Sequence, residues 1–131
     1  MSYTGILSGL KTRLETLDGL VSVLTYAPTS IQDAPLMYLM VGEGEITHAA
    51  QVVTAMHDIT ARLIVLWVDN EEAEKEAAPY VDAVVDAVRD DPYLGGTCLN
   101  AWVTRYEGAW VTIAGVEYRA IDFTVRVKEQ R

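Results

Sequence analysis

The sequence predicts an α+β domain, in which a mainly antiparallel sheet of about five or six strands carries two helices packed on one face. Two stretches place apolar residues at three- and four-residue intervals, as amphipathic helices do, whereas most other stretches alternate or run apolar over strand length. The order is helix, two or three strands, helix, three strands, which differs from the regular alternation of βαβ proteins. With 131 residues and no linker or repeat, the chain is expected to form one domain, residues 1–131.

The two predicted helices are both amphipathic. The first spans residues 3–17 and ends at Asp18-Gly19, because glycine suits the left-handed conformation that closes a helix. The second is acidic and begins at Asp69 or Asn70, either of which can cap it. Pro79 is expected either to kink this helix or to follow a loose first turn, with the well-formed helix starting near Ala78. The apolar stripes are Tyr3, Ile6, Leu7, Leu10, Leu14 and Leu17 in the first helix, and Ala77, Tyr80, Val81, Val84, Val85 and Val88 in the second.

Between the helices, strands are predicted at 20–26 and 36–42, with a proline-containing loop at 27–35. Residues 43–58 have no clean period, and their glycine-rich start suggests a hairpin tip, so we expect a long mobile excursion there. A strand at 59–68 follows and is apolar on both sides, which is typical of the centre of a sheet. One face of that strand is expected to carry Ile59, Ala61, Leu63, Val65 and Trp67.

The last third of the chain predicts three strands, at 97–106, 109–115 and 116–130. Short turns are expected at Glu107-Gly108 and Ala114-Gly115. In the final strand, alternate residues are expected to face the core or the solvent. Ile121, Phe123, Val125 and Val127 are the inward set, and Asp122, Thr124, Arg126 and Lys128 are the outward set.

The charge pattern argues against binding to a phosphate backbone, which requires clustered Lys and Arg. The net charge is −9, with 19 acidic and 10 basic residues. Nine of the acidic residues fall within 69–91, and four of the basic residues fall within 119–131. This separation indicates either an ordinary solvated helix face with a cationic end, or head-to-tail association of copies guided by opposite potentials.

No apolar run approaches the roughly 20 residues that a membrane helix needs, and the N-terminus lacks the pattern of a secretory signal. The single cysteine excludes an internal disulfide and a zinc site of the multi-cysteine type. We therefore expect a protein of intracellular origin that binds no membrane.

No stretch carries a recognisable catalytic, cofactor-binding or metal-binding pattern, so we expect a protein that is not an enzyme and holds no cofactor. Gly95-Gly96 follows a helix and precedes a strand, which is the reverse of a phosphate-binding loop. Cys98 is expected to pack in the core as a small hydrophobe. His48 and His57 are nine residues apart in the sequence, a spacing that matches no metal site.

Five stretches of the sequence, taken in their order along the chain, resemble the layout of a known protein family. They are the first helix closed by LDGL, the strand and loop VLTYAPTSIQDAPLMYLM, the central ARLIVLWVDN followed by the acidic helix, the segment DDPYLGG, and the closing YRAIDFTVRV. In this order they resemble the tail terminator (tail completion) proteins of long-tailed bacteriophages, the lambda-type minor tail protein family. Proteins of that family are small α+β domains that form a hexameric ring on the end of the tail tube.

The resemblance implies a structural virion protein at the head-proximal end of the phage tail, assembled in the host cytoplasm. A hexameric ring of copies would stop polymerisation of the major tail-tube protein and would present the surface that joins the head-completion or neck protein. DNA would pass through the lumen without specific binding. The 43–58 segment would correspond to the family's extended loop, and its Glu43, Glu45, His48 and Gln51 are the expected contacts with the tube.

Within such a ring, the acidic helix of one subunit is expected to meet the basic closing strand of the next subunit. The acidic residues sit four positions apart on one helix face, and they lack the oxygen-rich loop that a calcium site needs. The expected interface residues are Asp82, Asp86 and Asp90 on the helix, and Arg119, Arg126 and Lys128 on the strand.

Three other functional classes remain open at this stage. One is another head–tail connector, a neck protein or a tail-tube subunit, which share small α+β architecture and ring assembly. Another is a small enzyme that uses Cys98 or a histidine. The last is a ligand-binding module with Trp67, Trp102 and Trp110 around a pocket, although Trp67 is expected in the core and the other two are expected to pair across the last hairpins.

Overall fold

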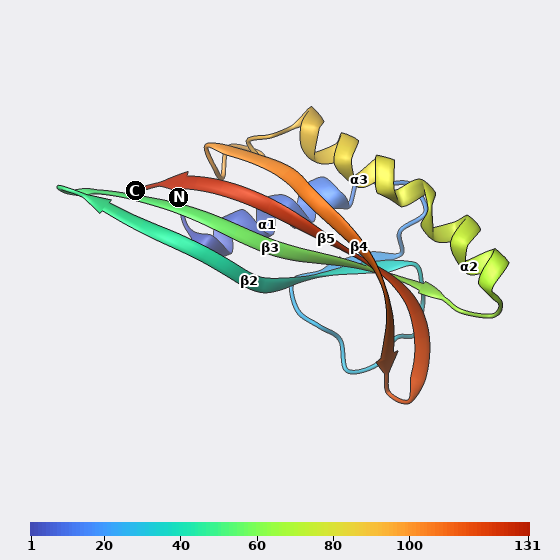
Figure 1. Ribbon diagram of the computed structural model, residues 1–131. Helices are drawn as coiled ribbons and strands as arrows, with labels where there is room; N and C mark the ends of the chain where they lie inside the picture. Colours follow the sequence, from blue (N-terminus) through green and yellow to red (C-terminus); the bar gives the residue numbers. More distant parts are fainter.

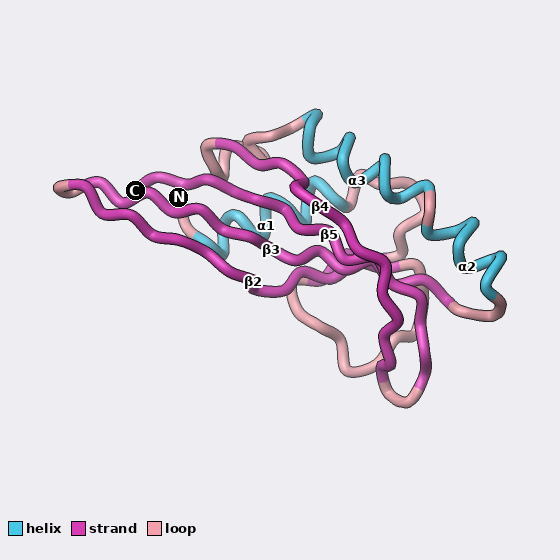
Figure 2. Tube along the Cα trace, in the orientation of Figure 1, coloured by secondary structure: helices cyan, strands magenta, loops and turns pink.

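The computed structural model describes residues 1–131 (Figures 1 and 2). The strands form one five-stranded sheet in the order β1-β2-β3-β5-β4, in which β1 and β2 run parallel and all other neighbours are antiparallel. The predicted α+β fold class is confirmed. The elements are α1 (Tyr3–Leu14), β1 (Ser22–Leu24), β2 (Leu36–Ala49), β3 (Val52–Leu66), α2 (Asn70–Ala77), α3 (Pro79–Asp90), β4 (Asn100–Ile113) and β5 (Val116–Gln130).

The helices cover one face of the sheet, and the main core lies between the two layers. The inward and outward sets predicted for β5 are confirmed by its alternating burial. β3 lies between β2 and β5, as predicted for a strand that is apolar on both sides. The core is built from α1, α3 and alternate residues of the central strands, and its largest fully buried members include Ile6, Leu10, Leu14, Met37, Leu39, Ile59, Leu63 and Phe123.

The acidic helix is divided at Pro79 into α2 and α3, at the position where a kink or a loose first turn was expected. Pro79 is the first residue of α3, the position where its missing N–H costs no intrahelical hydrogen bond. Asp69 caps α2 by accepting a hydrogen bond of 2.9 Å from the backbone N–H of Glu72. The apolar stripe predicted for this helix is wrong at one position, because Val85 is exposed on α3.

The prediction of a mobile excursion at 43–58 is wrong. β2 continues through this segment to Ala49, and β3 begins at Val52, so the two strands form one long hairpin that projects from the body of the molecule (Figure 1). The turn lies at Ala50, which has a positive φ of 56°, and not at the glycine-rich start.

A β-bulge between Val41 and Gly44 explains why the segment shows no clean period. The bulge shifts the register between β2 and β3, and therefore interrupts the alternation of inward and outward residues. Gly42 fits here because a Cβ at this position would collide with the backbone carbonyl of Asp58. We call residues 41–53 the arm; every residue from 41 to 52 in it is exposed.

The end of the chain holds two strands, not three. β4 runs without interruption through Glu107-Gly108, where a turn was expected, because Gly108 keeps its place in the ladder opposite Ile121. The turn lies at Ala114-Gly115, where φ is 52° and 78°. The β4–β5 hairpin bends away from the helices at this end (Figure 1).

The segment between α3 and β4 is a compact turn. Leu94, Gly95 and Gly96 all have positive φ, and the backbone N–H of Gly95 donates to the Asp91 carboxylate over 3.0 Å. Cys98 lies within this turn and not in a strand, but its predicted packing in the core is confirmed by an exposure of 3%. None of the three helices has the length and apolar content needed to span a membrane.

Candidate interaction surface

The face of the sheet turned away from the helices is only partly covered. At one end a small cluster of Leu36, Tyr38, Ile64, Tyr118 and Ala120 is closed over by the 25–35 loop and the bent β4–β5 hairpin. The remainder of this face is solvated and polar, and we call it the open face. Its charged residues are Glu43, Glu45, Asp58, Arg62, Arg105, Glu107, Asp122, Arg126 and Lys128.

Two arginine–aspartate pairs bridge β3 and β5 at the centre of the open face. Arg126 donates from Nε and Nη2 to the two oxygens of Asp58 over 2.9 and 3.1 Å. Arg62 donates in the same two-point manner to Asp122 over 2.6 and 2.9 Å, and a further bond of 3.2 Å joins Arg62 to the Tyr38 hydroxyl. Bidentate pairs of this kind hold both partners in fixed orientations.

The two pairs shift the pKa values of Asp58 and Arg62. The hydrogen bonds that Arg126 donates hold the pKa of Asp58 below its ordinary value, and the hydrogen bonds that Arg62 donates to Asp122 raise the pKa of Arg62. Asp58 is therefore ionised near neutral pH and serves neither as a proton donor nor as a free base.

These pairs were not expected from the sequence, although the sequence carries a signal for them. Asp58 and Arg62 on β3, and Asp122 and Arg126 on β5, are both spaced four residues apart with the acidic residue first. Antiparallel pairing reverses one of the two, so each acid meets a base. Only the register, which the sequence does not state, turns this spacing into a contact.

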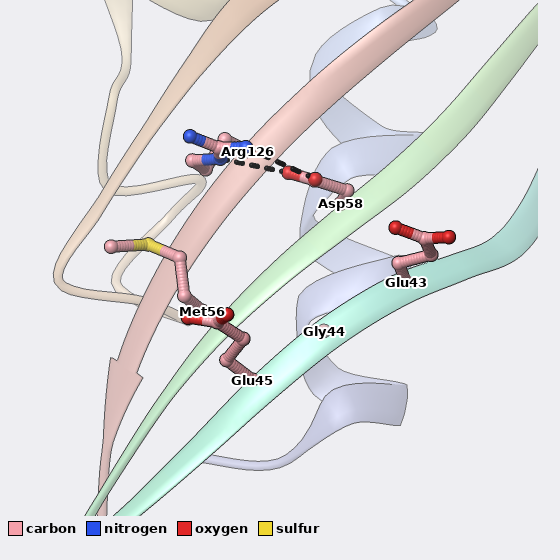
Figure 3. A pocket seen from close by; sticks show the side chains of 6 residues that line it. All are labelled: Glu43, Gly44, Glu45, Met56, Asp58 and Arg126. Carbon is pink, nitrogen blue, oxygen red and sulfur yellow. Dashed lines mark hydrogen bonds and ion pairs between the residues drawn. The ribbon is translucent and has the colours of Figure 1, made fainter.

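A hollow of about 710 Å³ lies on the open face where the arm leaves the body. Figure 3 shows its six lining residues, Glu43, Gly44, Glu45, Met56, Asp58 and Arg126, on the side of the strands away from the helix visible behind them. Three carboxylates face one guanidinium, so the hollow carries a net negative charge and does not attract phosphate.

The four residues predicted to contact a tail tube all lie exposed on the arm, but they do not form one patch. Glu43 and Glu45 line the hollow at its base. His48 pairs with Val53 in the ladder, on the opposite face of the arm, and Gln51 lies in the tip. The arm thus presents two separate groups of these residues.

The six residues predicted to join subunits lie on different surfaces. The aspartates Asp82, Asp86 and Asp90 are exposed on α3. Arg126 and Lys128 lie on the open face, whereas Arg119 lies on the helix side, beside α2. The basic residues therefore do not form one surface, and Arg119 and Arg126 pair with Glu74 and Asp58 rather than with these aspartates.

Most of the basic side chains already have a partner in the same chain. Arg119 donates to Glu74 over 2.6 Å, and Arg13 donates to the carbonyl of Ala87 over 2.6 Å. Of the ten Lys and Arg residues, Lys128 is the one without a carboxylate or carbonyl partner. A contact between copies that draws on the basic strand therefore has few free cations to use.

The tryptophans lie elsewhere than predicted. Trp67 is 42% exposed and follows the end of β3, so its expected place in the core is wrong. Trp102 and Trp110 belong to the same strand and do not pair with each other. Trp110 instead contacts Trp67 edge to face, with ring centroids 5.5 Å apart.

Neither Cys98 nor His57 has the surroundings of a nucleophile or its base. Burial raises the pKa of the Cys98 thiol, and its hydrogen-bond partner is the carbonyl of Pro92 at 3.6 Å. His57 stacks edge-on against Tyr3, with ring centroids 4.9 Å apart, and lies 3.5 Å from the buried carboxylate of Glu129. These residues do not form an arrangement for nucleophilic catalysis.

The fold of this chain is also found in a protein of known structure. No protein-family model and no curated protein matches the sequence. The solved structures that this chain matches include a chain of the "Virion of native gene transfer agent (GTA) particle", with a TM-score of 0.54 and 14% sequence identity. The match covers 99% of this chain and 100% of that chain, so the two share one fold over their whole lengths.

Proposed function

We propose that this protein is a structural component of a phage-type virion, a tail terminator that forms a ring on the end of the tail tube. The observation that carries the proposal is the fold shared, over the full length of both chains, with a chain of a gene transfer agent virion. The order of sequence motifs, which resembles that of tail terminators, supports the narrower role. In that role the ring stops polymerisation of the tube protein and presents the surface for the head-completion or neck protein.

The two edges of the sheet support assembly of copies into a ring. β1 pairs with β2 only from Leu36 to Tyr38, so the outer edge of β2 is free from Leu39 to Ala49. β4 lies at the other edge of the sheet, and its outer side has no strand partner. Free strand edges pair readily with other strands. Because the two edges belong to different strands, their pairing is a heterologous contact of the kind that closes into a ring.

The open face supports a role as the lumen surface. Its arginines are held by carboxylates of the same face, in the pairs Arg62–Asp122, Arg126–Asp58 and Arg105–Glu107. Cations that are already neutralised release few counterions on contact with DNA, so their affinity for phosphates is low. A lumen lined in this way lets DNA pass without binding it.

Matched variants test the edge contact in the purified protein. Ile46 is 64% exposed on the arm, and the variant Ile46→Lys places a charge on the free edge of β2, which discourages strand pairing. Ser8→Lys adds the same charge on α1, at an exposed position on the helix face of the sheet and not on either edge strand. Sedimentation should show rings for the wild-type protein and for Ser8→Lys, and folded monomers for Ile46→Lys. Rings formed equally well by Ile46→Lys would contradict the edge contact.

Elongation of tail tubes tests the function itself. Added in small amounts to polymerising tube protein, a terminator shortens the tubes and remains at one end. A tube subunit would instead polymerise without limit, and a neck protein would bind filled heads and leave tube length unchanged. Either of those results would replace the proposed role.

A further inference from the structure

An aromatic patch outside the open face has the properties of a docking site. It consists of Trp67, Val68 and Trp110, whose exposed fractions are 42%, 82% and 47%. Two half-exposed tryptophans in contact are unusual for a surface that meets only water, because large aromatic side chains dominate the energetics of protein interfaces. The patch lies where β3 ends and α2 begins, beside the bent β4–β5 hairpin.

Each tryptophan is held in place from within the chain. The indole Nε1–H of Trp67 donates to the Asn70 side chain over 2.9 Å. The guanidinium of Arg119 lies 4.9 Å from the ring centroid of Trp110, and Arg119 is itself bonded to Glu74 over 2.6 Å and to the carbonyl of Ala109 over 3.0 Å. Groups fixed before binding lose little conformational entropy when a partner arrives.

The one cation beside the patch, Arg119, is paired with Glu74, and the other charged groups next to it in the sequence are carboxylates. The first turn of α2 follows directly on Trp67 and Val68, and the carboxylates of Asp69 and Glu72 have no basic partner in the chain. This indicates a partner that carries positive charge next to an apolar side chain. A second copy is poorly suited to that role, since Lys128 is its one basic residue without a partner.

We propose that Trp67, Val68 and Trp110, together with the acidic start of α2, bind a cationic segment of a different protein through an apolar side chain flanked by Lys or Arg. The apolar side chain packs against the two indoles, and the flanking cations face Asp69 and Glu72. The proposal concerns a different surface from the edges and the open face, so it stands or fails separately from ring assembly.

Titration of the folded protein with model peptides tests this site, observed through the indole N–H signals of the three tryptophans in nuclear magnetic resonance spectra. Trp102 is the internal control, because it lies on the open face opposite Arg126. The peptide KKLKK should shift the signals of Trp67 and Trp110 and leave that of Trp102 in place. KKSKK should bind roughly tenfold more weakly, because it lacks the buried leucine. EELEE should produce no shift.

Charge variants locate the acidic part of the site. Glu72→Lys should weaken KKLKK binding roughly threefold to fivefold, whereas the matched Asp82→Lys on α3 should leave it unchanged. Backbone amide spectra confirm that both variants are folded. Equal binding of KKLKK and KKSKK, equal effects of the two variants, or no shift at millimolar peptide would overturn the proposal. Shifts of Trp67 and Trp110 that depend on protein concentration without peptide would also overturn it, because the occupant would then be a second copy.

Discussion

Asp58 and Arg126 lie directly opposite each other on β3 and β5, and two hydrogen bonds of 2.9 and 3.1 Å join their side chains. The same antiparallel register places Arg62 opposite Asp122. The charges at the centre of the open face are thus neutralised within the chain. Arginines that are already paired with carboxylates attract phosphates less than free arginines do. The proposed role of the open face as the lumen surface rests on this pairing.

Loss of the Asp58 carboxylate should weaken the fold in a manner that depends on pH. The pKa of Asp58 is lower in the folded chain than in the unfolded chain. Its contribution to the free energy of unfolding is therefore fully present above the ordinary carboxyl pKa of about 4, and is lost as pH falls through the lower folded value. We expect Asp58→Asn to unfold at lower urea concentration than the wild-type protein at pH 7, with the difference shrinking below pH 4. A difference independent of pH would contradict this origin.

The packing of α1 depends on the absence of a side chain at Gly9. A Cβ at this position would lie 2.5 Å from the carbonyl oxygen of Leu94 and from Oγ1 of Thr97. Gly9→Ala should therefore destabilise the protein by about 1–3 kcal/mol, although alanine normally favours a helix over glycine. The exposed neighbour Ser8 is the control, and Ser8→Ala should change stability by less than about 0.5 kcal/mol in the same urea titration. Stabilisation by Gly9→Ala would show that the turn at 94–97 adjusts freely.

The buried carboxylate of Glu129 should depend on Arg131 for its stability. Glu129 is fully buried, and its Oε1 accepts a hydrogen bond of 2.9 Å from Nε of Arg131 and forms an ion pair of 2.7 Å with Nη2 of the same side chain. Arg131→Ala should cost about 2 kcal/mol of unfolding free energy, because it removes the guanidinium from a buried carboxylate and leaves only His57 beside it, 3.5 Å away. The double variant Arg131→Ala with Glu129→Gln should recover most of that loss. If the double variant unfolds as easily as Arg131→Ala alone, the buried charge is not the cause.

The thiol of Cys98 should be unreactive until the protein unfolds. Burial raises the pKa of the thiol, so less thiolate is present at a given pH. The residue as a whole is only 3% exposed, so a reagent has little access to the sulfur. Ellman's reagent at pH 8 should label Cys98 at once in denaturant and only slowly in the folded protein. Cys98→Ala should still form rings. Rapid labelling of the folded protein, or an activity lost in Cys98→Ala, would favour the enzyme alternative.

The sequence predicts the layers of this fold well because the strongest local signals agree with the final packing. The alternation of apolar and polar residues from Ile121 to Val127 predicts a half-buried strand whatever its neighbours are, because successive side chains of a strand point to opposite faces of the sheet. Pro79 likewise ends one helix and begins the next through its own chemistry. Such signals survive in the folded molecule because tertiary contacts reinforce them.

The predictions that failed depend on partners far away in the sequence. Gly108 looks like a turn residue locally, but the pairing of β4 with β5 on both sides of it keeps the chain extended. The arm looks irregular because its bulge shifts the alternation between Val41 and Gly44. Trp67 looks like core by alternation, but β3 ends one residue before it. Register, bulges and strand ends are set by the pairing of whole strands, which local patterns do not encode.

The same limit applies to the candidate surface. The charged residues of the final strand were expected to serve a neighbouring subunit, yet Arg119 and Arg126 bond to Glu74 and Asp58 of their own chain. Glu43 and Glu45 were expected to contact a tail tube, but their meeting with Asp58 at the hollow requires the β2–β3 register. Contacts between copies remain predictions that assembly experiments must test.

Imaging of the purified protein mixed with tail tubes tests the central claim most directly. Negative-stain electron microscopy should show closed rings of one fixed size, with a single ring capping one end of each tube and no further growth at that end. Monomers alone, both with and without tubes, or rings that never occupy a tube end would contradict the claim that this chain terminates the tail.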